Sequence, residues 1–233
     1  MIPICIPTLN RGRDRLANLV ETALREDNEM LPTKLVIMDN GKQFPNAINV
    51  AECEDNDDTI KQIFDTTDHI ITVTTKTNLG VAASWNWFLK NVPMPEGFLI
   101  ISNDDILFDK TTLRSFYEEM QKIDTHFVIG CTGEFAIFSI SEEVFKATGG
   151  FDENFYPAYF EDNDFHYRMR LVGYDFVHAP YITYGHENSS TLAAYTPEQR
   201  SAHHLNFRKN RSYYANKWGG LPTKEKYTTP FGR

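Results

Sequence analysis

The sequence predicts an α/β protein whose central sheet is Rossmann-like, mixed and mainly parallel, flanked by helices and followed by a C-terminal helical extension. Over residues 1–130, short and almost wholly apolar segments alternate with longer amphipathic ones. This alternation is typical of βαβ units, in which buried parallel strands carry apolar side chains on both faces. Hydrophobic residues make up 41% and aromatic residues 13% of the 233 residues, which is enough for one packed core.

Four apolar segments in the first half have the length and composition of buried strands. They occupy residues 2–6, 35–38, 70–73 and 98–101. After the first of them, apolar residues recur at the spacing of one helix face, at Leu16, Leu19, Val20, Ala23 and Leu24. Further helices are predicted at residues 82–90 and 111–122. Strands and helices therefore alternate as the predicted fold requires.

The pattern changes in the second half, where shorter segments suggest strands added to a mixed sheet. These strands are predicted at residues 127–131, 135–140, 176–178 and 181–184. Ser141 can cap a short helix that ends at Gly149, and Gly173 ends a helix over residues 161–172. Thr196 opens a final helix that reaches about residue 217 and is expected to pack its C-terminal end onto the domain.

The charge distribution separates the body of the chain from its C-terminal extension. The net charge of −9 argues against broad nucleic-acid binding, which relies on Lys and Arg side chains that neutralise phosphates. Residues 196–233 nevertheless hold eight Lys or Arg against two acids, so residues 1–195 carry −15. The extension is either a solvated basic helix or a contact for a phosphate-bearing donor, an acidic acceptor or a membrane surface.

The sequence predicts a cytoplasmic protein that is soluble or peripherally attached to a membrane. No apolar run approaches the roughly 18 residues that a membrane helix needs. Met1 leads directly into the first predicted strand, without a secretory signal pattern. The three cysteines, Cys5, Cys53 and Cys131, show no C-x-x-C spacing, which favours reduced thiols over a disulfide framework or a zinc site.

Acidic residues follow the predicted strand at residues 98–101, in the segment Asn103-Asp104-Asp105. Open α/β sheets bind ligands at the carboxyl edge of their strands. Adjacent carboxylates repel each other, and a bound Mg²⁺ or Mn²⁺ that bridges a diphosphate would relieve this repulsion. The alternative is an ordinary turn or helix cap, which acidic residues also favour.

Polar segments also follow other predicted elements in a fixed order along the chain. They are Pro7-Thr8-Leu9-Asn10-Arg11, Asp39-Asn40-Gly41, Asn78-Leu79-Gly80 with Asn86, Phe151-Asp152-Glu153-Asn154-Phe155, Glu161-Asp162-Asn163-Asp164 and Tyr184-Gly185-His186. Each has a bland interpretation by itself: Asp39 can form an Asx turn before Gly41, and acids in the first turn of a helix are common.

Taken together, these segments resemble the landmarks of glycosyltransferase family 2, from residue 4 to about residue 186. Asn103-Asp104-Asp105 is similar to the D-x-D motif in its N-x-D form. The segments at 7–11, 39–41 and 78–86 resemble the family patterns P-S/T-x-N-R, V-D-N/D-G/S and N-x-G-x-x-x-A/G-x-N. Residues 151–173 resemble the signature G-F-D-E-x-F…E-D-x-D…R…G, which is the most specific match.

The resemblance implies a GT-A fold and a set of site residues. It implies a nucleotide-binding half at 1–105 and an acceptor and catalytic half at 106–195. Donor contacts are implied for Pro7, Thr8, Asn10, Arg11, Asp39, Asn78, Gly80, Asn86, Asn103 and Asp104. Asp105 and His186 are the implied ligands of Mn²⁺ or Mg²⁺, and imidazole favours Mn²⁺.

The same resemblance implies that Asp162 is the general base and that Glu161 orients the acceptor. We expect the dipole of the predicted helix to keep Asp162 ionised. The expected reaction moves a sugar with inversion from a UDP- or dTDP-sugar to a hydroxyl of a glycan, lipid-linked, protein or modified-base acceptor. One alternative is a sugar nucleotidyltransferase, although its G-x-G-T-R loop is absent after the first predicted strand. Another is a catalytically silent nucleotide-sugar-binding module.

Overall fold

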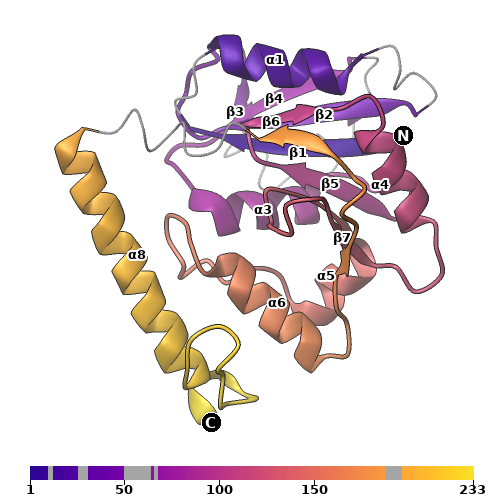
Figure 1. Ribbon diagram of the computed structural model, residues 1–233. Helices are drawn as coiled ribbons and strands as arrows, with labels where there is room; N and C mark the ends of the chain where they lie inside the picture. The colour runs from indigo at the N-terminus through magenta and orange to yellow at the C-terminus, as the bar shows by residue number, and fades with distance from the viewer. Residues whose placement is uncertain (10–12, 26–30, 50–63, 66–67, 187–195) are drawn as a thin grey trace.

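The computed structural model describes residues 1–9, 13–25, 31–49, 64–65, 68–186 and 196–233. The strands are β1 (Ile2–Thr8), β2 (Thr33–Asp39), β3 (Ile48–Asn49), β4 (Ile70–Thr74), β5 (Phe98–Ser102), β6 (Ile106–Phe108), β7 (Phe127–Ile129), β8 (Ile137–Ser141), β9 (Val177–His178) and β10 (Tyr184–His186). The helices are α1 (Arg13–Ala23), α3 (Gly80–Asn91), α4 (Thr112–Met120), α5 (Glu142–Thr148), α6 (Glu161–Leu171) and α8 (Pro197–Trp218), and a 3-10 helix, η3, spans Pro230–Gly232 (Figure 1).

The central sheet has eight strands in the order β3-β4-β2-β1-β5-β8-β7-β9. The pairs β1–β2, β2–β4, β3–β4, β1–β5 and β7–β9 are parallel. Strand β8 runs antiparallel to both of its neighbours, β5 and β7. The prediction of a mixed, mainly parallel sheet flanked by helices is therefore confirmed.

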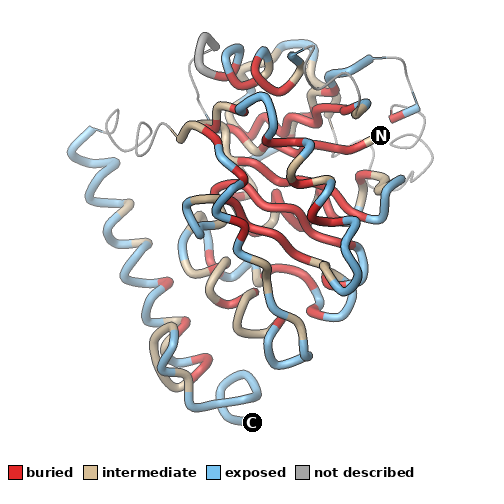
Figure 2. Tube along the Cα trace, turned by 45° about the vertical axis from the view of Figure 1, so that its right-hand side comes forward, coloured by how far each residue is buried: buried red, intermediate tan, exposed pale blue. Residues whose placement is uncertain are grey.

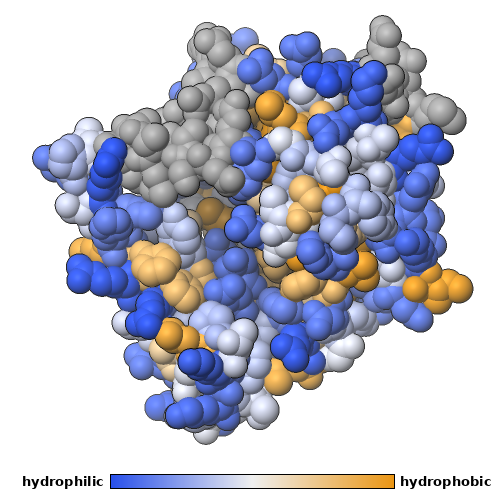
Figure 3. All heavy atoms as spheres, in the orientation of Figure 1, coloured by the Kyte–Doolittle hydropathy of each residue, from blue (hydrophilic) through white to orange (hydrophobic). Residues whose placement is uncertain are grey.

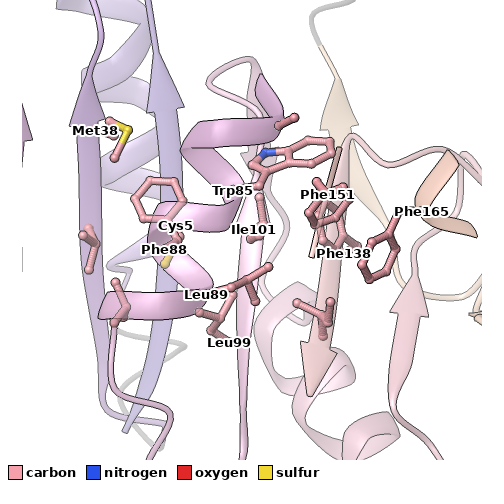
Figure 4. Close-up of a cluster of buried hydrophobic side chains, with 14 of the residues drawn as sticks. Cys5, Met38, Trp85, Phe88, Leu89, Leu99, Ile101, Phe138, Phe151 and Phe165 are labelled. Carbon is pink, nitrogen blue, oxygen red and sulfur yellow. The ribbon is translucent and has the colours of Figure 1, made fainter. Parts of the chain in front are cut away.

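Side chains alternate between the two faces of the sheet, as the two-residue period of a strand requires. Along β1, Cys5 joins one hydrophobic cluster while Ile4 and Ile6 join the other. Helices α3, α5 and α6 cover the first face, and helices α1 and α4 cover the second. In the first cluster the Trp85 ring makes edge contacts with Phe138 and Phe151, as Figure 4 shows. Trp85 is thus a core residue.

Two short strands, β6 and β10, form a separate antiparallel pair that the sequence patterns did not predict in full. Strand β6 was not predicted, and the last strand was expected at residues 181–184 rather than 184–186. Their register sets His186 opposite Ile106 and Gly185 opposite Leu107. A three-residue strand has too little sequence for a period to be recognised, so tertiary pairing fixes these boundaries.

Helix α8 contacts the rest of the protein mainly through its C-terminal half. Tyr214 and Trp218 are buried with Phe155 in a third hydrophobic cluster, which confirms that this end packs onto the body. The N-terminal half is largely exposed (Figure 2). Figure 3 shows mostly hydrophilic residues on the visible face, with hydrophobic residues in separate groups. Among the described segments, no helix combines the length and apolar character needed to cross a bilayer.

Candidate active site

The carboxyl ends of three neighbouring strands are joined by hydrogen bonds. Thr8, at the end of β1, donates through Oγ1 to Asp104 Oδ2 at 2.7 Å. Thr8 also lies opposite Asp39 in the β1–β2 register, and its carbonyl accepts the N–H of Asn40 at 2.9 Å. The ends of β1, β2 and β5 therefore present Thr8, Asp39 and Asp104 at one edge of the sheet, the edge at which α/β folds bind ligands.

Asp39 closes a tight turn after β2. Its fully buried carboxylate accepts the N–H of Gly41 at Oδ1 (3.0 Å) and the N–H of Phe44 at Oδ2 (2.7 Å). The Asx turn that the sequence offered as an alternative is therefore present. Each carboxylate oxygen keeps a second lone pair, so a hydrogen bond from a donor base is compatible with this turn and stays a prediction.

The start of α3 is covered by residues 156–157. Gly80 has φ +77°, and a Cβ there would lie 2.8 Å from Pro157 O and 2.9 Å from Tyr156 Cδ2. The Val81 N–H donates to Pro157 O at 2.8 Å. The lack of a side chain at Gly80 allows the close approach of the Tyr156–Pro157 backbone, and the donor contact implied for Gly80 stays a prediction. Asn78 accepts the Gly80 N–H at 2.9 Å and so shapes the same turn.

Asn86 links α3 to the segment that precedes α6. Its side chain is buried, and its Nδ2 donates to Phe151 O and Glu153 Oε1, both at 2.8 Å. Its Oδ1 accepts the Phe151 N–H at 2.7 Å. The amide is thus bonded within the protein at both ends, and the donor contact implied for Asn86 stays a prediction.

Asp105 and His186 lie side by side at the start of β6 and the end of β10. His186 Nε2 is 3.3 Å from Asp105 Oδ1, and the side chains are 12% and 13% exposed. Buried polar atoms normally have a hydrogen-bond partner, but among the residues that the structure describes Asp105 Oδ1 and His186 Nδ1 have none. The two predicted metal ligands therefore meet, with donor atoms still available.

The donor set of this pair fits a divalent cation. Neighbouring ligands of an octahedral Mg²⁺ at about 2.1 Å lie roughly 3 Å apart, close to the observed separation of the two side chains. Within the described residues, no group of three or more His, Cys, Asp or Glu side chains is placed to hold a metal. A pair suits ions that keep several waters and substrate phosphates as their remaining ligands.

The turn at residues 132–136 bonds to Asn103 after β5 and to Tyr184 in β10, and the charge of Glu134 in this turn acts on Asp162 in α6. Ala136 O accepts the Asn103 N–H at 2.8 Å, and Thr132 Oγ1 lies 2.7 Å from the hydroxyl of Tyr184 in β10. The Glu134 charge raises the pKa of Asp162, although burial contributes more. Glu134 is a functional candidate that the sequence patterns missed, because its only signal was its place between two strands.

Glu161 and Asp162 begin α6 in a largely buried environment. Burial raises the pKa of Asp162 despite the opposing N–H of Asn163, which donates to Oδ1 at 2.7 Å. Burial and the adjacent Asp162 charge raise the pKa of Glu161 well above its ordinary value, and its Oε2 has no hydrogen-bond partner within the described part of the chain. Burial therefore has the larger effect on the pKa of Asp162, and the expectation that Asp162 is ionised stays a prediction.

Other acids of the same sequence signature anchor the C-terminal helix instead. Lys217 of α8 bonds Asp152 Oδ2 at 2.7 Å and Asp164 Oδ1 at 2.6 Å. Asp164, fully buried, also accepts the Trp218 Nε1–H and the Arg168 Nε–H, each at 2.8 Å. Although burial raises the pKa of Asp152, the Lys217 and Asn154 donors outweigh that effect and hold it below its ordinary value. The signature therefore combines the candidate catalytic pair Glu161 and Asp162 with a structural network around Asp152 and Asp164.

The remaining predicted donor contacts are only partly described. Asn10 and Arg11 lie outside the described residues. Pro7 lies near the end of β1, opposite Met38. Asn103 is half-buried directly after β5, beside the turn at 132–136. The roles of Pro7 and Asn103 toward a donor stay predictions.

Comparisons with known proteins agree with this arrangement. Residues 4–140 match the glycosyl transferase family 2 profile. A galactofuranosyl glycosyltransferase of Leishmania donovani is 49% identical over 39 residues, which are 17% of this chain and 9% of that protein.

Solved structures share the fold at low sequence identity. Mannosyltransferase PcManGT from Pyrobaculum calidifontis, in complex with GDP-Man and Mn²⁺, has a TM-score of 0.56 and 15% identity over 89% of this chain and 63% of its own. GalNAc-T7, with UDP, GalNAc and Mn²⁺, has a TM-score of 0.62 and 12% identity over 80% and 43%. TarS 1–349 of S. aureus has a TM-score of 0.54 and 12% identity over 78% and 59%. The chain thus spans less than two thirds of each of these proteins.

The family match covers more than half of the chain. It includes the edge at which Thr8, Asp39 and Asp104 gather, and the solved neighbours share the mixed sheet that positions them. The resemblance predicted from the sequence is confirmed, and the chain belongs to glycosyl transferase family 2 and has a GT-A fold.

Proposed function

We propose that this chain is an inverting glycosyltransferase that moves a sugar from a UDP- or dTDP-sugar to an acceptor hydroxyl. The reaction is a single displacement. Asp162 takes the proton of the acceptor hydroxyl, the acceptor oxygen bonds to the anomeric carbon, and the bond from that carbon to the diphosphate oxygen breaks. The nucleoside diphosphate leaves with the bonding electron pair.

The observation that carries the proposal is the pairing of Asp105 with His186 at the same sheet edge as Asp104 and Thr8. These two residues would hold Mn²⁺ or Mg²⁺, and a divalent ion bound there would neutralise charge on the departing diphosphate. The imidazole favours Mn²⁺. The complexes of PcManGT with GDP-Man and Mn²⁺, and of GalNAc-T7 with UDP and Mn²⁺, support this choice.

The surroundings of Asp162 support its role as the base. A catalytic base works best when its pKa lies near the operating pH, and burial moves the Asp162 pKa in that direction. Glu161 lies beside it with a raised pKa and an unpartnered Oε2. Glu161 can therefore offer a hydrogen bond to an acceptor that approaches the base.

The donor base is proposed to be a pyrimidine because of Asp39. A uracil or thymine ring carries an N3–H donor, and a carboxylate is a strong acceptor for it. Asp39 is fixed by the N–H groups of Gly41 and Phe44. A carboxylate held in this way costs little further ordering when a base binds.

The first experiment is a nucleotide-release assay with Mn²⁺ across UDP-, dTDP- and GDP-sugars, with wild-type protein and Asp162→Asn. We expect release from UDP- or dTDP-sugars, and a turnover for Asp162→Asn that is lower by about two to four orders of magnitude. Calorimetry should show unchanged UDP affinity in the variant. Equal turnover in the two proteins would remove Asp162 from the mechanism. No release from any donor would instead favour a silent binding module.

A further inference from the structure

The segment that leads into α6 has a backbone conformation that side-chain-bearing residues rarely adopt. Tyr159 and Phe160 have φ values of +79° and +74°, a left-handed conformation in which the Cβ lies too close to the following carbonyl oxygen. Phe160 is also the N-cap of α6, and its side chain makes no capping hydrogen bond. Other parts of the protein must hold the two residues in place.

Asn210 of α8 provides a direct tie to this segment. Its side chain is 1% exposed, and its Nδ2 lies 2.8 Å from Ala158 O, 3.3 Å from Tyr159 O and 3.4 Å from Tyr156 O. A side-chain amide carries two N–H donors, and those of Asn210 lie within reach of three carbonyls of this segment, with Ala158 O the nearest. Asn210 therefore fixes the backbone just before the reactive acids.

Aromatic contacts from α8 support the same segment. The Phe207 ring lies 5.4 Å from the rings of both Tyr159 and Phe160. His203 Nε2 lies 2.7 Å from the Tyr159 hydroxyl. On the opposite side, the segment is joined to α3 through Pro157 O. Residues 156–160 therefore contact two helices, α3 through Pro157 O and α8 through Asn210.

We propose that Asn210 is a positioning residue that sets the place of Asp162 through residues 156–160. This inference rests on the proposed role of Asp162 as the base. Asp162 follows Phe160 by two positions, and Phe160 O accepts the Asp164 N–H at 3.0 Å in the first turn of α6. A shift of the segment would therefore move the start of the helix. The C-terminal helix is then part of the catalytic apparatus and not only a basic appendage.

The test uses the full-length chain with Asn210→Ala and Asn210→Leu, two variants that remove the amide donors in different ways. Leu keeps most of the side-chain volume, so a packing defect in the Ala variant is separated from the lost hydrogen bonds. Asn216→Ala is the matched control, because Asn216 is an exposed asparagine of the same helix. Each protein is assayed for kcat, donor KM, thermal midpoint and amide hydrogen exchange.

We expect kcat to fall by about 10- to 100-fold in both Asn210 variants, since a misplacement of about 1 Å can cost 100-fold. Donor KM should stay at the wild-type value, because the strand ends that face the donor are untouched. Hydrogen exchange should become faster at residues 160–164 and stay unchanged in β1 and β5. Asn216→Ala should match wild type in every measurement.

Wild-type kcat or unchanged exchange at 160–164 in both Asn210 variants would overturn the inference. Faster exchange throughout the protein, with kcat and donor KM affected alike, would also overturn it, since that result indicates general destabilisation. Wild-type protein that transfers no sugar from any donor would overturn the proposed function itself. An active wild-type enzyme with unaffected Asn210 variants would overturn only the positioning role.

Discussion

His186 Nε2 lies 3.3 Å from Asp105 Oδ1 because β6 and β10 pair in a register that sets His186 opposite Ile106. The two residues are distant in the chain, and the antiparallel pairing brings them together at the carboxyl end of β5.

Removing either member of this pair should weaken metal-dependent nucleotide binding. Loss of an outer-shell partner of a metal site costs about 10- to 100-fold in affinity, and loss of a direct ligand should cost at least as much. We expect this for Asp105→Asn and His186→Ala, measured by calorimetry of UDP with and without Mn²⁺. His178→Ala, which changes an exposed histidine of β9, should bind like wild type. Equal UDP affinity with and without Mn²⁺ in the wild-type protein would contradict the metal role.

The raised pKa of Asp162 predicts an acid limb in the activity profile at higher pH than an ordinary aspartate gives, about 3.9. The base acts only as the carboxylate, so kcat should fall as the pH drops through this pKa. Glu134→Gln removes a nearby negative charge that raises it, and the limb should therefore move to lower pH. The measurement is kcat against pH at saturating donor. A limb that stays in place in Glu134→Gln would exclude this electrostatic link.

Glu161 should make the folded protein less stable as the pH rises. Burial raises its pKa, so in the window between the ordinary and the raised pKa the folded state binds more protons than the unfolded state. The free energy of unfolding then decreases with increasing pH. The side chain introduced by Glu161→Gln cannot ionise. The thermal midpoint of this variant should therefore increase relative to that of wild type as the pH rises through this window. A constant difference between the two midpoints would show that Glu161 does not titrate there.

Substitution of Lys217 should destabilise the folded protein more than substitution of Lys209, the other lysine of α8. The Lys217 side chain is 7% exposed and bonds two carboxylates, one of them fully buried. Lys217→Met leaves Asp152 and Asp164 without this cation, and breaking a buried pair in this way costs about 3–5 kcal/mol. Lys209→Met is the control, because Lys209 is exposed on the same helix. Denaturant unfolding measures both variants, and equal losses would show that the network adds little.

Alanine substitutions at two glycines can distinguish the cost of backbone strain from the cost of a steric clash. Gly80 begins α3, and Gly97 lies just before β5. Gly80 and Gly97 have φ values of +77° and +80°, but a Cβ at Gly97 meets nothing within 4 Å, whereas one at Gly80 meets Pro157 O at 2.8 Å. Gly97→Ala should cost only the strain, about 1–2 kcal/mol. Gly80→Ala should cost more and should also lower kcat, because it displaces residues 156–157. Equal free energies of unfolding would mean that the segment moves freely away from α3.

The sequence by itself determined the fold class, the edge at which the site forms and the family. The reason is that these features rest on local patterns: apolar strands alternate with amphipathic helices, and polar residues follow β1, β2 and β5 directly. The acids after β5 and at the start of α6 were found in the same way, because a strand end or a helix start fixes where a short polar segment can lie.

Only the tertiary structure decided which distant parts of the protein each of these residues contacts. The local motifs of Asn86 and Gly80 did not reveal that Asn86 bonds Phe151 and that Gly80 leaves room for Pro157. Asn210 and Lys217 had no motif, because their partners lie far away in the chain. The direction of the Asp162 pKa shift also depended on packing, since burial raises this pKa more than the surrounding hydrogen bonds lower it. Desolvation and side-chain contacts arise from the folded arrangement of distant segments, and no local spacing encodes them.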